Sequence, residues 1–152
     1  MMKSVLPSDV WPSEEFEGQY WFFQLIVWLD FLADPLPNTV IETGTYRGSG
    51  AYRWSKFFDT VHTVELSEEL YLDNLKKYGH INSINFHMGS SIEFLTEFLP
   101  TMDDRCIIML DAHGSGQDTT FDESVGRYGS PVIGELLAIK ENSIRNDHVI
   151  II

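Results

Sequence analysis

The sequence predicts a doubly wound α/β fold, in which a mostly parallel sheet is covered by helices on both faces. Short, continuously apolar segments alternate with segments of helical periodicity from about residue 39 to residue 152. Strands that are apolar throughout are typical of parallel sheets buried between two helix layers. Right-handed crossovers between such strands lead to a doubly wound sheet, whose ligands bind at the carboxyl ends of the strands.

Length and composition agree with one globular domain. The chain has 152 residues, of which 43% are hydrophobic and 13% aromatic, and it contains no internal repeat. These values suit a chain that buries a core and are far from those of disordered segments. We expect residues 1–152 to form a single domain, with an N-terminal helix and linker over 1–38 and the α/β core over 39–152.

The first helix is expected from about residue 14 to residue 33. Ser13 is placed to cap it, and "DPLPN" ends it. One face carries apolar side chains at helical spacing: Trp21, Leu25, Trp28, Leu29 and Leu32. The other side is apolar as well, which predicts burial on two faces or against a partner subunit.

Strands and helices then alternate, with turn or capping residues between them. The expected strands are 39–43, 60–66, 84–88, 106–111 and 148–152. The expected helices are 49–58, 67–79, Ser90 to Pro100, and one that opens with Pro131 at its first position. Ser67 and Gly79 suit the two ends of the second of these helices, and Ser90 with Glu93 has the spacing of a capping box.

Two acidic residues end neighbouring strands beside a glycine-rich turn. In "VIETGTYRGSG", Glu42 lies near the end of the first strand, and the three glycines that follow would let a ligand approach the backbone closely. Their G-x-x-x-G-x-G spacing differs from the dinucleotide fingerprint G-x-G-x-x-G. Glu65 ends the second strand, twenty-one residues after Gly44, close to the offset at which a carboxylate holds ribose hydroxyls. The structural alternative for the glycine loop is a tight turn, and the alternative for Glu65 is a solvated residue at a strand terminus.

Four stretches, in order, resemble the successive motifs of a known family: "VIETGTYRGSGAYRWSKFF", "VHTVELSEELY", "INFHMGSSIEFL" and "IIMLDAHGSG". The chain resembles class I S-adenosylmethionine-dependent methyltransferases, especially the small-molecule and sugar O-methyltransferase branch of polysaccharide and antibiotic pathways. The resemblance covers about residues 38–152 and implies a Rossmann-like sheet with strand order 3-2-1-4-5. Members continue with two further strands, so the chain is expected to be a fragment or a short member that covers its open sheet edge by self-association.

The resemblance implies S-adenosylmethionine as the cofactor. The implied cofactor-binding residues lie at the strand ends: Glu42, Gly44, Thr45, Tyr46, Arg47, Gly48, Glu65, Leu66, Gly89, Ser90 and Asp111. Glu42, Gly44 and Thr45 would line the methionine part, and the loop over 46–48 would surround it. Glu65 would hold the ribose hydroxyls, with Leu66 against the adenine. Gly89 and Ser90 stand at the adenine edge, where relatives commonly carry an aspartate. A helix cap is the equal alternative for Ser90.

Asp111 and His113 are the expected catalytic residues. Asp111 ends the fourth strand, beneath the expected position of the transferred methyl group. Methyl transfer is an in-line displacement that needs an aligned, desolvated nucleophile, and a hydroxyl acceptor also benefits from a base. His113 titrates in the useful range and is the candidate base, with a surface loop histidine as the alternative.

Mg²⁺ is left unassigned, with Asp111 as the candidate ligand. Relatives in the antibiotic-sugar branch hold Mg²⁺ through carboxylates, and hard cations need several oxygen ligands. Asp118, Asp122 and Glu123 follow in the next loop, but the acidic pair expected after the fifth strand is absent from this sequence. The long polar loop over 112–130 suits either a substrate lid or a disordered insertion.

The charge balance excludes some partners. A formal net charge of -13 repels nucleic acid and anionic membrane surfaces. No signal peptide or membrane-spanning stretch is predicted, and the lone Cys106 is expected to be buried and inert, so the expected location is the cytoplasm.

Two main functions stay open. The first is O-methylation of a small molecule or of a sugar or glycan precursor. The second is a non-catalytic domain that binds a nucleotide or S-adenosylmethionine, or that serves assembly. An NAD-dependent oxidoreductase is a third function, which the glycine spacing disfavours.

Overall fold

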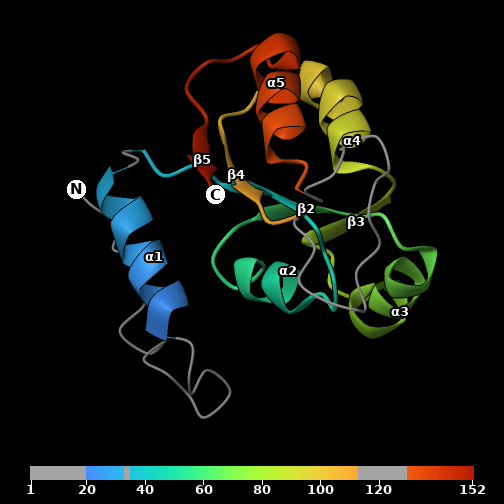
Figure 1. Ribbon diagram of the computed structural model, residues 1–152. Coiled ribbons are helices and arrows are strands. Elements are labelled where there is room, and N and C mark those ends of the chain that lie inside the picture. Colours follow the sequence, from blue (N-terminus) through green and yellow to red (C-terminus); the bar gives the residue numbers. More distant parts are fainter. Residues whose placement is uncertain (1–19, 33–34, 113–129) are drawn as a thin grey trace. The chain divides into compact units, whose positions relative to one another are not determined.

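The chain forms two compact units, residues 1–36 and 37–152. The computed structural model in Figure 1 describes residues 20–32, 35–112 and 130–152. The first unit contains helix α1 (Tyr20–Leu32), and the second contains the sheet with its helices. The predicted start of the first helix, near residue 14, lies outside the described residues.

Helix α1 buries Leu29 of the predicted face, but the rest of its buried stripe differs from the prediction. Phe22, Ile26 and Leu29 are buried, whereas Trp28, which was expected on the buried face, is 60% exposed. Spacings of four and three residues place the buried three on one helical face. Since nearly every residue of this helix is apolar, its sequence gives no periodic signal that would select one face over another.

The second unit contains a five-stranded, all-parallel sheet. Its strands are β1 (Thr39–Thr43), β2 (Thr60–Glu65), β3 (Ile84–Met88), β4 (Cys106–Leu110) and β5 (Val149–Ile151). Their order, β3-β2-β1-β4-β5, confirms the predicted 3-2-1-4-5 topology. The winding direction reverses between the central β1 and β4, which is where doubly wound sheets bind their ligands.

Among the described residues of the second unit, two helices cover each face of the sheet (Figure 1). On one face lie α2 (Ser49–Trp54) and α3 (Glu68–Tyr78), and on the other lie α4 (Ser91–Phe98) and α5 (Val132–Asn142). A short 3-10 turn, η2 (Leu99–Thr101), follows α4. None of the described helices has the length and apolar character needed to cross a membrane.

The helix boundaries confirm one predicted cap and correct another. The Ser67 hydroxyl accepts the Leu70 N–H at 3.4 Å, as expected for the cap of α3. The predicted capping box of α4 is wrong, because the Ser90 side chain makes no capping hydrogen bond. Ser90 caps α4 through its backbone carbonyl alone, which accepts the Phe94 N–H at 2.9 Å.

Two other boundaries differ from the prediction by small amounts. Helix α2 ends at Trp54, not at residue 58, because the following N–H groups of Lys56 and Phe57 bond to carbonyls only three residues back. Helix α5 begins at Val132, so that Pro131 is its N-cap and not its first residue.

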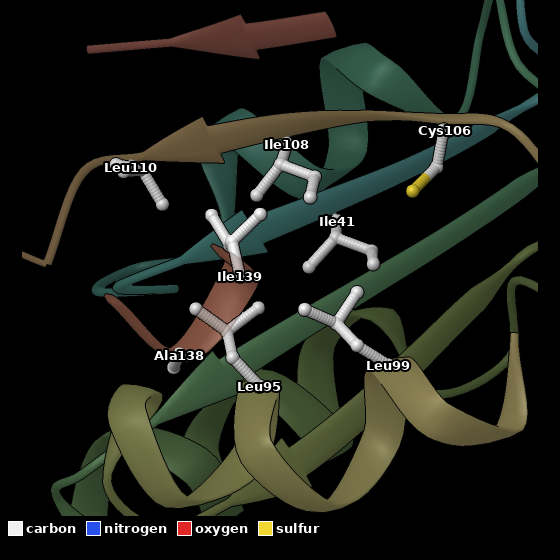
Figure 2. Close-up of a cluster of buried hydrophobic side chains, with 8 residues drawn as sticks. All are labelled: Ile41, Leu95, Leu99, Cys106, Ile108, Leu110, Ala138 and Ile139. Atoms are coloured by element: carbon white, nitrogen blue, oxygen red, sulfur yellow. The ribbon is translucent and has the colours of Figure 1, made fainter. Parts of the chain in front are cut away.

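A hydrophobic cluster fills the space between the sheet and the α4/α5 layer (Figure 2). It joins side chains of two central strands to side chains of α4, η2 and α5: Ile41, Leu95, Leu99, Cys106, Ile108, Leu110, Ala138 and Ile139. Each large aliphatic side chain buried in this way contributes roughly 1.5–3 kcal/mol. Cys106 is buried, as expected, and burial raises the pKa of its thiol to about 12, which disfavours the reactive thiolate.

A pair of histidines lies beside α4. The His62 Nδ1 and His87 Nε2 atoms are 3.1 Å apart, and the rings stand 4.6 Å from Phe98 and 4.5 Å from Phe94 respectively. Burial, together with the charge of His87, lowers the pKa of His62 to about 4. Burial also lowers the pKa of His87. Their mutual contact and ring packing indicate a structural role for both histidines.

Candidate functional site

The carboxyl ends of four strands bring the predicted site residues to one edge of the sheet. Gly44 follows β1, Leu66 follows β2, Gly89 follows β3, and Asp111 follows β4. Parallel pairing keeps these ends level, because β1 is in continuous register with both β2 and β4. The remaining predicted catalytic residue, His113, lies outside the described residues.

The turn between β1 and α2, residues 44–48, has a left-handed backbone at three positions. The φ angles are 80° at Gly44, 49° at Tyr46 and 73° at Gly48. At Gly44 a second constraint also requires glycine, since a Cβ there would lie 2.7 Å from the carbonyl oxygen of Asp111. The turn therefore packs directly against the end of β4, at the reversal of the winding.

Glu42 is buried beneath α2. The residue is only 4% exposed, and its Oε2 accepts a hydrogen bond of 2.9 Å from Thr63 Oγ1. Thr63 Oγ1 in turn lies 2.7 Å from Thr45 Oγ1. A Cβ on Gly50, in the first turn of α2, would overlap Oε1 of this carboxyl group. Glu42 thus supports the turn from below, with Gly50 making room for it.

Burial changes the charge state of Glu42. Desolvation raises its pKa to about 8, and the nearby charge of Asp111 acts in the same direction. Hydrogen bonds from Thr63 and Trp54 lower the pKa but do not offset the loss of water. At pH 7 the folded protein therefore holds Glu42 mainly in its neutral form.

Glu65 binds the same turn from the neighbouring strand. Its Oε2 accepts the Tyr46 N–H at 2.7 Å, and its Oε1 accepts the Ser67 N–H at 2.9 Å. The residue is 7% exposed. Each carboxylate oxygen has two lone pairs, so this arrangement leaves acceptor capacity for a ligand hydroxyl. Glu65 therefore joins the glycine turn to the start of α3.

Glu42 and Glu65 meet at one turn. The chain of side-chain contacts runs from Glu42 through Thr63 to Thr45, and the next residue, Tyr46, is bound to Glu65. The two acids were predictable from the sequence, whereas Thr63 was not predicted. Its signal would have been a hydroxyl at the position of β2 that pairs with Glu42.

Open space borders the end of β3. Gly89 has a φ of 144°, and a Cβ built on it would have no atom within 4 Å. Its N–H donates to the Glu65 carbonyl at 2.9 Å, so the open space lies beside the end of β2. Leu66 and Ser90, on the two flanks, are half-buried. A flat ligand could approach the backbone closely at this point.

Asp111 is exposed at the end of β4. Its N–H donates to Thr43 Oγ1 at 3.1 Å, which fixes its backbone against β1. Among the described residues no group of three or more His, Cys, Asp or Glu side chains is placed to hold a metal ion. The loop acids Asp118, Asp122 and Glu123 lie outside the described residues.

A recess of about 460 Å³ lies between the turn and α3. It is lined by Tyr46, Arg47, Ser67, Glu69, Leu70, Asp73, Asn74 and Lys77. The Arg47 guanidinium carbon stands 5.3 Å from the centre of the Tyr46 ring. Sequence reasoning missed Asn74, which occupies the inner side of α3 between Leu70 and Tyr78, where an apolar residue is usual.

Comparison with known proteins finds likeness in structure only. No protein-family model matches the chain, and no curated protein sequence matches it. A proposed type II methyltransferase from Anaeromyxobacter dehalogenans superposes with a TM-score of 0.55 at 16% identity over 84% of this chain. A proposed methyltransferase from Streptococcus mutans, solved in complex with SAH, superposes with a TM-score of 0.51 at 14% identity over 78% of this chain. The chain has the class I methyltransferase fold.

A third structure with this methyltransferase fold is a precorrin decarboxylase from Methanobacterium thermoautotrophicum. It has a TM-score of 0.50 at 16% identity over 84% of this chain. The chain covers 44%, 65% and 60% of the lengths of these three proteins, in the order given. It therefore spans about half to two thirds of the structures that share its methyltransferase fold.

Proposed function

We propose that this protein is an S-adenosylmethionine-dependent methyltransferase that methylates a hydroxyl of a small molecule or of a sugar or glycan precursor. The observation that carries the proposal is a pair of acids beside one glycine turn at the reversal of the winding: Glu65 accepts a hydrogen bond from the turn, and Glu42 is linked to it through Thr63. The fold and the open space at Gly89 agree with it.

The residues at the carboxyl edge fit this cofactor. Glu65 would accept the ribose hydroxyls through its remaining lone pairs, and the open space at Gly89 would admit the adenine, with Leu66 and the Ser90 hydroxyl at its edges. The turn would surround the methionine part. When bound, the cofactor supplies an electrophilic methyl group on a sulfonium.

Asp111 and His113 would act on the acceptor. Asp111, exposed at the end of β4, would orient the acceptor hydroxyl toward the methyl group. His113, two residues further along the chain, would take the hydroxyl proton as the oxygen bonds to the methyl carbon and the bond from that carbon to sulfur breaks, with the electron pair staying on sulfur. Asp111 and the loop acids are also the side chains that would hold Mg²⁺, if the reaction uses it.

Calorimetric titration of the protein tests the cofactor. We expect binding of S-adenosylmethionine and of its demethylated product, and no binding of NAD. A methyl-release assay across hydroxyl acceptors then separates an enzyme from a protein that only binds the cofactor. Failure to bind either form of the cofactor would reject the proposal, and binding without methyl release to any acceptor would favour a non-catalytic domain.

Replacement of the candidate base tests the chemistry. We expect His113→Ala to lower turnover by roughly 10²–10⁴-fold, the usual contribution of a general base, while the affinity for the demethylated cofactor stays within about twofold. His80→Ala, at an exposed histidine beyond α3, is the matched control. Equal turnover in the His113 variant and in wild type would refute the assignment.

A further inference from the structure

Tyr46 adopts a backbone conformation that is unfavourable for its residue type. Of the described residues, it alone has a positive φ without being a glycine. A side chain in the left-handed region costs on the order of 1–3 kcal/mol, and such residues persist only where the surrounding structure holds them. Contacts around Tyr46 must therefore supply that hold.

Both peptide groups of Tyr46 are fixed by side chains from other elements. Its N–H donates to Glu65 Oε2 at 2.7 Å, and its carbonyl accepts a hydrogen bond of 2.6 Å from Asn74 Nδ2. A carbonyl can only accept, so this contact also fixes which way the Asn74 amide points. Glu65 lies on β2 and Asn74 on α3, so two separate elements act on the same residue.

Asn74 is built into this position. It is 2% exposed, and it is the buried residue of α3, a helix whose other side chains are half-buried or exposed. Burial of an amide is costly unless its hydrogen bonds are satisfied. The opposite side of the amide lies against the turn as well, because a Cβ on Gly48 would overlap Asn74 Oδ1. The glycine at 48 therefore makes room for the asparagine.

We propose that Asn74 is a positioning residue for cofactor binding, which keeps Tyr46 in its left-handed conformation and thereby holds the glycine turn against Glu65. The inference rests on the proposed function. Loss of the Asn74 amide leaves the Tyr46 carbonyl without its buried donor. The turn would then relax away from the strained conformation, and Glu65 would lose the N–H that orients its carboxylate.

The experiment is a double-mutant cycle read by calorimetry with the demethylated cofactor. We expect Asn74→Ala to weaken affinity by about tenfold, the effect of one buried hydrogen bond. Glycine reaches a positive φ without strain. In the Tyr46→Gly background, the same Asn74→Ala change should therefore weaken affinity by only about threefold or less. Asn85→Ala, at an exposed asparagine that also donates to a backbone carbonyl, should leave affinity unchanged.

A second measurement separates positioning from general stability. Amide hydrogen exchange over residues 44–48 should be faster in Asn74→Ala than in wild type, while exchange in β1 and β4 stays the same. An Asn74 effect of equal size in both Tyr46 backgrounds, or exchange that rises throughout the sheet, would overturn the inference and leave the proposed function standing. No cofactor binding by the wild-type protein would overturn both.

Discussion

Two hydrogen-bond networks join neighbouring strands at opposite ends of the sheet, and they are built from different groups. The carboxyl-end network contains two buried acids and the turn that they hold. The amino-end network is centred on His148, whose Nδ1 accepts the Cys106 N–H at 3.2 Å and whose Nε2 lies 2.6 Å from Ser143 Oγ. It ties the start of β4 to the end of α5 and the approach to β5.

The two networks also differ in backbone strain and in the kind of titratable group that they bury. The described residues with a positive φ all lie at the carboxyl end: Gly44, Tyr46, Gly48 and Gly89. The amino-end network holds an inert thiol and a histidine whose pKa is lowered by burial, so its groups are neutral at pH 7. Strain and buried acids destabilise a fold and are concentrated at functional sites. These differences favour ligand binding at the carboxyl end, as proposed above, and a structural role for the amino-end network.

The largest expected effect concerns Glu42 and pH. Its folded pKa of about 8 lies above the unfolded value of 4.5, so the folded state retains a proton that the unfolded state releases. The contribution of Glu42 is fully present below pH 4.5, and the free energy of unfolding falls as the pH rises toward 8. Glu42→Gln removes this dependence. Between pH 5 and pH 9 the free energy of unfolding of the variant, relative to that of wild type, should therefore rise by an amount of the order of a few kcal/mol.

Urea unfolding at several pH values measures this difference. Glu97→Gln, at an exposed glutamate on α4, is the matched control and should follow wild type at every pH. If the free energies of unfolding of wild type and Glu42→Gln fall by the same amount as the pH rises, Glu42 is ionised in the folded state. The carboxyl-end network would then carry a buried charge, contrary to the raised pKa of Glu42.

The second effect concerns cofactor affinity. If Glu65 holds the ribose, Glu65→Ala should weaken binding of the demethylated cofactor by roughly 1.5–3 kcal/mol, about 10- to 150-fold, because a charged hydrogen bond is removed. Titration calorimetry measures the change, with Glu97→Ala as the control. Unchanged affinity would remove Glu65 from the site and leave it as an anchor of the turn.

The smallest effect is expected at the amino end. His148→Leu removes an acceptor and a donor, and should lower the free energy of unfolding at pH 7.5 by roughly 1–3 kcal/mol. Affinity for the demethylated cofactor should not change. Because the folded pKa of His148 is lowered, wild type should lose stability as the pH falls below the unfolded value of 6.5, and the variant should lose less.

Titration calorimetry and urea unfolding on the same samples check this pair of expectations. A His148 variant with weakened cofactor binding would contradict the division of roles between the two ends. It would mean that the amino-end network transmits its effect along β4 to Asp111.

The strands were the most predictable part of the fold. β1 and β3 occupy the predicted residues. β2 and β4 end one residue before the predicted end, and β5 is one residue shorter at each end. Continuous apolar runs bounded by polar residues mark such strands clearly, because both of their faces are buried. The exposed Trp28 illustrates the opposite case, since an apolar run that also forms a helix does not reveal which face is covered.

The site was predictable where a residue type carries its own chemistry. Glu42 and Glu65 stood out because an acid at the end of a buried strand requires an explanation. Asn74 and Thr63 did not, because their importance depends on contacts with residues 28 and 21 positions away. The bonding of Glu65 to two backbone N–H groups was also hidden, since backbone partners have no signature in the sequence.

The glycine at position 50 has a consequence for how this chain can vary. Glycine inside a helix costs about 1 kcal/mol relative to alanine, yet here the methyl group of alanine would occupy the place of the Glu42 carboxyl. A shorter acid at 42 would release that restriction. Positions 42 and 50, on different elements, are therefore expected to change together during evolution, with a gain in volume at one balanced by a loss at the other.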